Sequence, residues 1–218
     1  MDPNAGKRTL VNKLSREELQ AKLDAESFHR TTVSFYKYVI IENPQALRDE
    51  LFAQWSEWDC LGRIYVSREG INAQMNVPQH HWDAFDAFIH GMEYFHDVPF
   101  KLAVTDKTEG KSFLKLVVKV REQIVADGLQ PEDYDVTDVG AHLTAKDWND
   151  AIEKNDPVVV DMRNHYESEI GHFEGAVLPE AETFREELPM VLEKLKGQED
   201  RKILLYCTGG IRCEKTSA

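Results

Sequence analysis

One cysteine of the chain lies where a reactive thiolate is expected. Cys207 follows the apolar run 203–206, which we interpret as a strand, and open α/β sheets bind ligands beyond the carboxyl ends of their strands. Thr208, Gly209 and Gly210 come next. Because glycine permits unusual backbone angles, successive N–H groups of this loop can turn toward one point. The loop therefore predicts an anion site around the sulfur.

A helix is expected to begin directly after the loop, at Ile211 and Arg212. The positive end of its dipole would face Cys207, and the guanidinium of Arg212 adds a full positive charge. Both effects favour the thiolate, and a lowered pKa is what makes a cysteine reactive. We therefore predict that Cys207 and Arg212 are catalytic and that the backbone from Thr208 to Ile211 forms the active-site loop.

The other two cysteines are interpreted differently. Cys60 follows the expected end of a helix and is predicted to be a small buried residue. Cys213 lies in the first turn of the helix after the loop; we interpret it as a packing residue, with a resolving thiol or a second nucleophile as the alternative. A disulfide between Cys207 and Cys213 would require the backbone to adjust. Three cysteines are too few for a secreted disulfide framework and fit reduced thiols in the cytoplasm.

The elements around the loop predict an α/β domain over residues 142–218. A helix capped by Thr144 is followed by the apolar strand 158–160, a helix over 182–196 and the strand that ends at Cys207. Short, wholly apolar strands are typical of a parallel sheet that is covered on both faces. The acidic segment 121–141 has no clear period and is interpreted as a linker.

The first half of the chain predicts a ferredoxin-like domain over residues 30–120. Residues 1–29 form a leader and a short helix that Ser15 caps. Five strands and two helices then follow in the order strand, helix, strand, strand, helix, strand, strand: 33–41, a helix from Pro44, 62–66, 71–77, 79–92, 99–105 and 112–120. This is the split βαβ arrangement, with an antiparallel-rich sheet and both helices on one face.

Two motifs of the second half resemble a known domain family. The segment 159–163, Glu167 and the segment 171–176 together resemble the opening signature of rhodanese domains, and the segment 207–212 resembles their active-site loop. In that superfamily the loop holds a persulfide on the cysteine, and four residues between cysteine and arginine suit sulfur transfer, whereas the related phosphatases have one more. The resemblance implies that Asp161 and Arg163 lie near the site in a structural role and that His172 is architectural.

The resemblance extends into the first half. The segments 62–66 and 68–74, taken with 207–215, are similar to bacterial rhodanese-domain proteins that act as oxygen-dependent tRNA uridine hydroxylases. This similarity implies 5-hydroxylation of the wobble uridine, position 34, with the anticodon loop of tRNA as partner, molecular oxygen as co-substrate and neither metal nor other cofactor. Arg63, Arg68 and Asn72 are then candidates for RNA binding. Further basic candidates in this half are Lys101, Lys111, Lys115 and Lys119.

Other functions stay open at this point. A sulfurtransferase with a persulfide on Cys207 explains the loop equally well, and a non-catalytic binding module is a third possibility. The net charge of −13 argues against a broad nucleic-acid surface but allows a basic patch in the first half. No apolar run is long enough to span a membrane, so a cytoplasmic protein is expected. The 77 residues from 142 to 218 are short for a rhodanese domain, so we expect an incomplete version of a longer protein.

Overall fold

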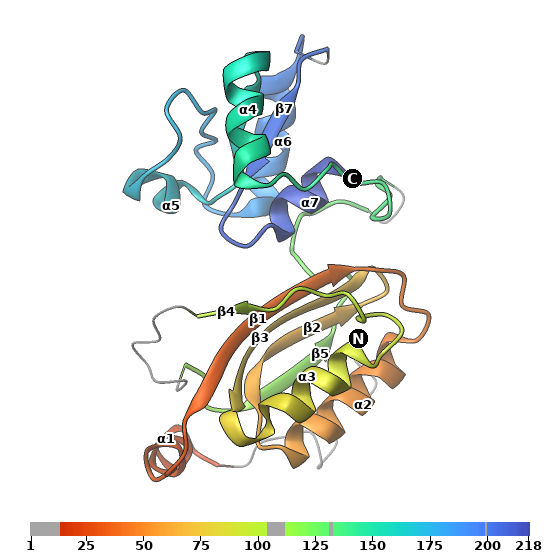
Figure 1. Cartoon of the computed structure of the whole chain (residues 1–218), viewed down its shortest axis with the longest axis vertical. Coiled ribbons are helices and arrows are strands. Elements are labelled where there is room, and N and C mark those ends of the chain that lie inside the picture. The colour runs from red at the N-terminus through yellow and green to blue at the C-terminus, as the bar shows by residue number, and fades with distance from the viewer. Residues whose placement is uncertain (1–13, 104–111, 131–132, 199) are drawn as a thin grey trace. The chain divides into compact units, whose positions relative to one another are not determined.

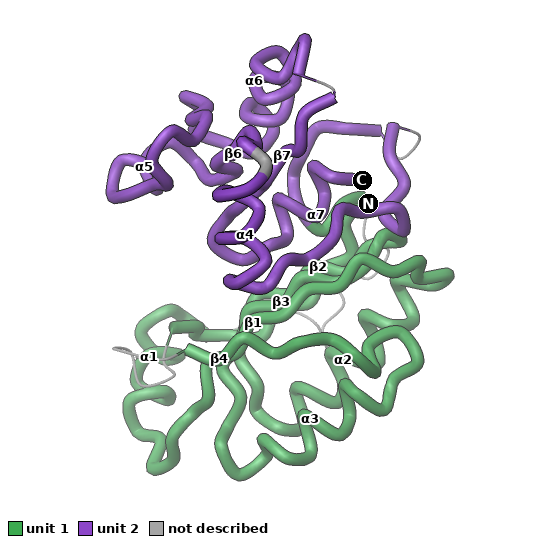
Figure 2. Tube along the Cα trace, turned by 45° about the horizontal axis from the view of Figure 1, so that its top comes forward, with its two compact units in different colours: residues 1–124 green, residues 125–218 purple. Residues whose placement is uncertain are grey.

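The computed structural model describes residues 14–103, 112–130, 133–198 and 200–218 (Figure 1). The chain divides into two compact units, residues 1–124 and 125–218 (Figure 2). Most of the segment 121–141 thus belongs to the second unit. The predicted leader 1–13 and Lys111 lie outside the described residues.

The first unit has one five-stranded sheet with two helices on one face (Figure 1). The strand order is β4-β1-β3-β2-β5, in which β2 and β5 are parallel and the other neighbours antiparallel. The elements are α1 (Arg16–Asp24), β1 (Arg30–Tyr38), α2 (Pro44–Glu57), β2 (Leu61–Ser67), β3 (Gly70–Pro78), the 3₁₀ helix η1 (Gln79–His81), α3 (Trp82–His90), β4 (Lys101–Leu102) and β5 (Leu116–Val120). This order confirms the predicted ferredoxin-like arrangement.

Local sequence explains the ends of these elements. Ser15 and Glu18 form the predicted capping box of α1, each side chain accepting a hydrogen bond from the other residue's N–H. Asn43 accepts the Ala46 N–H and so caps α2 ahead of its proline. At the β2–β3 turn, Gly70 has φ +144°, and a Cβ there would lie 2.0 Å from the carbonyl oxygen of Lys37. The turn therefore requires glycine.

Two predicted strands begin later than expected. Within 99–105, β4 begins at Lys101, since Pro99 has no N–H to donate to a neighbouring strand. The N–H of Ala103 still donates to the carbonyl of Thr32, and residues 104 and 105 lie outside the described residues. Within 112–120, the strand begins only at Leu116, and the N–H of Phe113 is bound by the side chain of Asn76 rather than by a strand. The core of this unit is apolar and aromatic, with Phe35, Trp55, Ile64, Met75 and Phe85 among its buried side chains.

The second unit contains, in its described residues, one pair of parallel strands together with helices. Its elements are α4 (Ala145–Asn155), β6 (Val158–Asp161), α5 (His165–Ile170), α6 (Phe184–Leu195), β7 (Ile203–Tyr206) and α7 (Ile211–Ser217). Thr144 caps α4 as predicted, and β6 pairs with β7 so that Asp161 lies beside Tyr206. Val177 forms a further parallel bridge to Val160. The short helix α5 was not expected from the sequence.

The segment that precedes α4 is attached to α7 by a buried ion pair. Lys215 on α7 lies 3.2 Å from a carboxylate oxygen of Asp127, and both side chains are fully buried. The Lys215 ammonium also lies 3.1 Å from the ring centroid of Tyr134. A buried cation is stable only when it is paired. These contacts therefore hold the last turn of α7, the helix that follows the loop ending at Gly210.

Candidate active site

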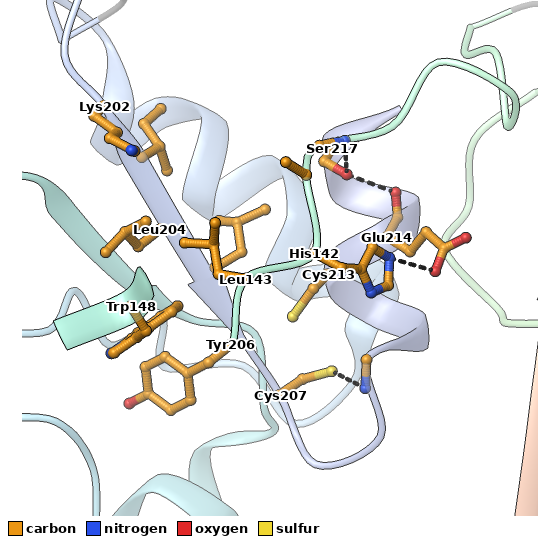
Figure 3. Close-up of a pocket in the computed structure, with 15 residues that line it drawn as sticks. His142, Leu143, Trp148, Lys202, Leu204, Tyr206, Cys207, Cys213, Glu214 and Ser217 are labelled. Carbon is orange, nitrogen blue, oxygen red and sulfur yellow. Dashed lines mark hydrogen bonds and ion pairs between the residues drawn. The ribbon is translucent and has the colours of Figure 1, made fainter. Parts of the chain in front are cut away.

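Cys207 lies directly after β7 and begins the loop that leads into α7 (Figure 3). Its sulfur accepts the N–H of Gly210 at 3.0 Å. Gly210 has φ +89°, a left-handed conformation that suits glycine and aims its N–H back at the sulfur. The N–H groups of Gly209 and Cys213 also donate to this sulfur. The loop therefore surrounds one sulfur atom with backbone donors.

The thiol of Cys213 is the strongest influence on Cys207. It donates a hydrogen bond to the sulfur of Cys207 and, with the three backbone N–H groups, lowers the pKa of Cys207 to about 5, although burial opposes the shift. The same hydrogen bond, together with burial, raises the pKa of Cys213. At neutral pH the pair thus carries one proton, which stays on Cys213, and Cys207 is a thiolate.

Removing the Cys213 thiol is therefore expected to weaken the acidity of Cys207. In Cys213→Ala the pKa of Cys207 should rise from about 5 toward its ordinary value of 9.0, whereas Cys213→Ser keeps a hydroxyl donor and should retain most of the shift. The pH dependence of alkylation by iodoacetamide measures this pKa. An alanine variant whose alkylation profile matches that of the wild type would contradict the assignment.

Arg212 is held by oxygen atoms of α5 and the loop. Its guanidinium donates to Glu167 Oε1 at 2.9 Å and to Asn164 Oδ1 at 3.2 Å, and it also reaches Glu167 Oε2 and the hydroxyl of Thr208. Burial raises the pKa of Glu167, but the hydrogen bonds from Arg212 and Thr208 outweigh it and the net shift is downward. Arg212 therefore acts on Cys207 through its charge, while its hydrogen bonds go to carboxylate, amide and hydroxyl oxygens.

Asp161 and Arg163 form a second ion pair beside the loop. The two Asp161 oxygens accept the Arg163 guanidinium at 2.8 and 2.7 Å, and Oδ2 also accepts the hydroxyls of Tyr206 and Ser168. Burial raises the pKa of Asp161, yet these donors prevail and hold it below its usual range. Arg163 also donates to the carbonyl of Gly171 at 2.6 Å. The pair thus connects β6, β7 and the turn after α5.

One acidic residue of the site was missed by the sequence analysis. The side chain of Glu187 on α6 is fully buried, and neither carboxylate oxygen has a hydrogen-bond partner among the described residues. Burial raises its pKa to about 8; nearby Arg212 opposes this, and the charges of Asp161 and Cys207 add to it. Glu187 is therefore protonated at neutral pH.

A sequence signal for this residue did exist. Glu187 stands in the apolar stripe of its helix with Phe184, Leu188 and Val191, which are spaced three to four residues apart and are buried. An acidic residue on such a stripe is either neutral or paired once the helix packs. The stripe therefore marked Glu187 as a buried acid.

Within the described residues, two hollows include Cys207 in their lining. One has a volume of about 440 Å³ and extends along β7 from Lys202 to Cys207, with Cys213 projecting toward it from α7 (Figure 3). The other, of about 380 Å³, is lined by Arg163, Gly171, His172, Phe173, Tyr206, Cys207 and Thr208. The first hollow is lined by residues of β7, of α7 and of the segment 140–143, together with Trp148. The second has aromatic walls, because the rings of Phe173 and Tyr206 meet edge to face with centroids 4.8 Å apart.

The candidates for RNA binding all lie in the first unit. Arg63 on β2 and Arg68 in the β2–β3 turn are exposed, and Asn72 on β3 donates its amide to the carbonyl of Ile124 at 3.1 Å. Lys101, Lys115 and Lys119 are also exposed.

His172, which was predicted to be architectural, lies in the wall of the second hollow, where its Nδ1 bonds to the carbonyl oxygen of Ser168.

Neither a metal cluster nor a membrane helix is found within the described ranges. No three histidine, cysteine or acidic side chains there are arranged to hold a metal ion. No helix in the same ranges combines the length and the apolar character needed to cross a bilayer.

Comparison with protein families identifies both units. Residues 30–124 match the UPF0176 acylphosphatase like domain, and residues 144–218 match the rhodanese-like domain. The predicted ferredoxin-like and rhodanese-like folds are therefore confirmed.

Curated relatives align with nearly the whole chain. A protein of Leptospira interrogans named tRNA uridine(34) hydroxylase is 55% identical over 212 residues, which cover 97% of this chain and 57% of that protein. Proteins of the same name from Yersinia enterocolitica and Erwinia tasmaniensis are 47% and 49% identical, and each alignment covers 96% of this chain and 59% of the relative. The chain spans between 57 and 60% of the length of such relatives.

Proposed function

The chain belongs to the proteins that join a UPF0176 acylphosphatase-like domain to a rhodanese-like domain, and we propose that it takes part in 5-hydroxylation of uridine 34 in tRNA. The relatives named tRNA uridine(34) hydroxylase supply the substrate and the reaction. The proposal includes molecular oxygen as co-substrate and assigns no resident cofactor. Its partner is the anticodon loop of tRNA, and its place is the cytoplasm, where tRNA is found.

The observation that carries this proposal is the Cys207 thiolate with protonated Glu187 nearby. The thiolate is stable at neutral pH, since its pKa is lowered to about 5, and Glu187 keeps its proton, since its pKa is raised to about 8. A thiolate near an acid suits addition of sulfur to C6 of a uracil ring, which breaks the C5=C6 π bond and raises the electron density at C5. After oxygen has entered at C5, loss of the C5 proton and breakage of the C6–S bond restore the double bond and release the Cys207 thiolate. Cys207 is the proposed nucleophile, and Arg212 and the loop amides stabilise its anionic form.

The overall reaction must balance. The C5–H bond of uracil becomes C5–OH, one oxygen atom of O₂ enters this bond, and the other leaves as water. This change needs two electrons and two protons besides O₂. A thiol reductant that is oxidised to a disulfide supplies both. The second hollow is the proposed entry for the base, because the rings of Phe173 and Tyr206 there offer surfaces on which an unstacked base can pack.

A sulfurtransferase remains the alternative function. The observation in its favour is the loop, which surrounds the sulfur of Cys207 with donors and has four residues before Arg212. The same donors would stabilise a persulfide anion. The names of the relatives favour the hydroxylase.

The test is to delete the gene and measure 5-hydroxyuridine derivatives in digested total tRNA by mass spectrometry. The deletion should lower these nucleosides, and a plasmid copy of wild type, but not of Cys207→Ala, should restore them. If deletion changes nothing, any second route to the modification is removed and the measurement is repeated. Persistence of the wild-type level after that step would reject the hydroxylase, and assay of thiosulfate:cyanide sulfur transfer would then test the alternative.

A further inference from the structure

One face of the sheet in the first unit is left uncovered by α2 and α3. Side chains alternate along its strands, so Val33 and Phe35 of β1 are buried in the core while Ser34 and Tyr36 point to the opposite side. We call this side the open face. Its central residues are Ser34, Tyr36, Arg63, Tyr65, Asn72, Gln74, Lys101, Val117 and Lys119, while Tyr38 and Asn76 on the same side are buried.

Strand pairing arranges this face in two rows. In one row, Tyr36 pairs with Asn72, Asn72 with Tyr65, and Tyr65 with Lys119. In the next row, Lys101 pairs with Ser34, Ser34 with Gln74, and Gln74 with Arg63. The two tyrosines are thus separated by one strand, or about 10 Å. At this spacing, each ring can stack on a different base of an extended single strand.

The face is basic although the protein is acidic. The five strands of this sheet contain no aspartate and no glutamate, whereas the chain as a whole carries −13. Arg63, Lys101 and Lys119 are exposed, and Arg121 follows at the end of β5. Such a local excess of positive charge complements a polyanion.

Each tyrosine of the open face lies beside a cation. The ammonium of Lys101 is 5.1 Å from the ring centroid of Tyr36, and the guanidinium carbon of Arg121 is 5.7 Å from that of Tyr65. Both rings are partly exposed, and neither belongs to the buried apolar cluster that forms the core of this unit. An exposed ring beside a cation presents one surface for a base and one charge for a phosphate.

We propose that the open face binds single-stranded RNA, with bases stacked on Tyr36 and Tyr65 and with Arg63, Lys101, Lys119 and Arg121 at the phosphates. The choice of tRNA as the RNA rests on the proposed function, and unpaired anticodon nucleotides are its single-stranded part. Gln74 is exposed on the strand between the two tyrosines and offers its amide group to a base edge, whereas the amide of Asn72 is already bound to the carbonyl of Ile124. The first unit would therefore be the part of the chain that holds the RNA.

The aromatic contribution is tested by equilibrium binding of a fluorescein-labelled ten-nucleotide oligouridine to the purified chain, read as fluorescence anisotropy. Tyr36→Leu and Tyr65→Leu keep an apolar side chain but remove the ring, and each should raise Kd by about 5- to 150-fold, which corresponds to the ~1–3 kcal/mol of one stacked base. The matched variants Tyr36→Phe and Tyr65→Phe keep the ring and should bind within about twofold of wild type. Thermal unfolding of each variant verifies that it is folded.

The ionic contribution is tested by the salt dependence of the same binding. Each of Arg63→Ala, Lys101→Ala and Lys119→Ala should reduce the slope of log K against log salt by about 0.7 if that side chain neutralises one phosphate of a single strand. Lys146→Ala removes an exposed charge from α4 of the second unit and should leave the slope unchanged.

Three results would overturn the proposal. These are wild-type chain that does not bind the oligonucleotide, a Tyr36→Leu/Tyr65→Leu double variant that binds it as wild type does, and phenylalanine variants that bind as weakly as the leucine variants. Binding that is lost only with the charges would show a non-specific anion surface and would reject the stacking. Because no turnover is needed, failure of this proposal is distinct from failure of the proposed hydroxylation.

Discussion

Cys207→Ser is expected to lower the proposed uridine hydroxylation by about 1,000-fold or more, because the serine hydroxyl stays protonated where the cysteine is a thiolate. The fold should be unaffected, since the hydroxyl can accept the Gly210 N–H that the sulfur accepts now. The measurement is 5-hydroxyuridine in tRNA from the deletion strain that carries the variant gene. Normal levels of the nucleoside in that strain would remove Cys207 from the reaction.

The same thiolate gives wild-type protein a characteristic alkylation profile. With a pKa of about 5, Cys207 should react with iodoacetamide at a nearly constant rate from pH 6 to 9 and should lose reactivity below pH 5. Burial raises the pKa of Cys60 to about 12, so Cys60 should not react over this range, and Cys60→Ala serves as the control. A rate that climbs through pH 8 would instead show an ordinary thiol at position 207.

Glu187→Gln is expected to have a larger free energy of unfolding than wild type, and this difference should grow as the pH rises. The pKa of Glu187 is raised from 4.5 to about 8, so the unfolded chain releases this proton more readily than the folded one. By linkage, the contribution of Glu187 to the free energy of unfolding of wild type has its full value below pH 4.5 and is lost as the pH rises to 8. At about 1.4 kcal/mol per pKa unit, wild type loses ~4 kcal/mol of its free energy of unfolding between pH 5 and 8. The variant avoids this loss because glutamine does not titrate.

The free energy of unfolding by urea at pH 5, 7 and 9 measures this effect. The difference between variant and wild type should grow with pH, while Glu193→Gln, an exposed position on the same helix, should give no such trend. The charged groups that act on Glu187 are Arg212, Asp161, Cys207 and Glu167, and all of them are retained in both proteins. Parallel stability curves for variant and wild type from pH 5 to 9 would show that Glu187 is ionised in the folded state.

Most of the fold could be predicted because apolar residues recur with clear periods. The capping residues Ser15, Asn43 and Thr144 also fixed three helix starts to the residue. What could not be predicted depends on partners far along the chain. The strand over 112–120 begins late because Asn76 of another strand binds the N–H of Phe113, and the interpretation of 121–141 as a linker contains no sign that Asp127 pairs with Lys215.

The candidate site likewise combines features that the local sequence predicts with features that depend on residues far along the chain. Cys207, its glycines and the helix start at Ile211 are contiguous, so their geometry is local and could be anticipated. The Cys213 thiol acts on Cys207 through the exact turn of the loop, which sequence spacing alone does not reveal. Glu187 reaches the site from α6, some twenty residues earlier, and only the packing of that helix brings its carboxyl there. The catalytic roles themselves stay predictions until the variants are measured.

The pairing of both guanidinium groups beside Cys207 has a consequence for which ligands the loop admits. Arg212 is engaged by Glu167 and Arg163 by Asp161, so each positive charge already has its counterion. An arriving oxyanion such as thiosulfate or vanadate would have to displace a carboxylate and approach a thiolate, whereas a neutral pyrimidine ring meets no such repulsion. The loop is therefore expected to discriminate by ligand charge, and such oxyanions should compete poorly with the uracil ring of the proposed substrate.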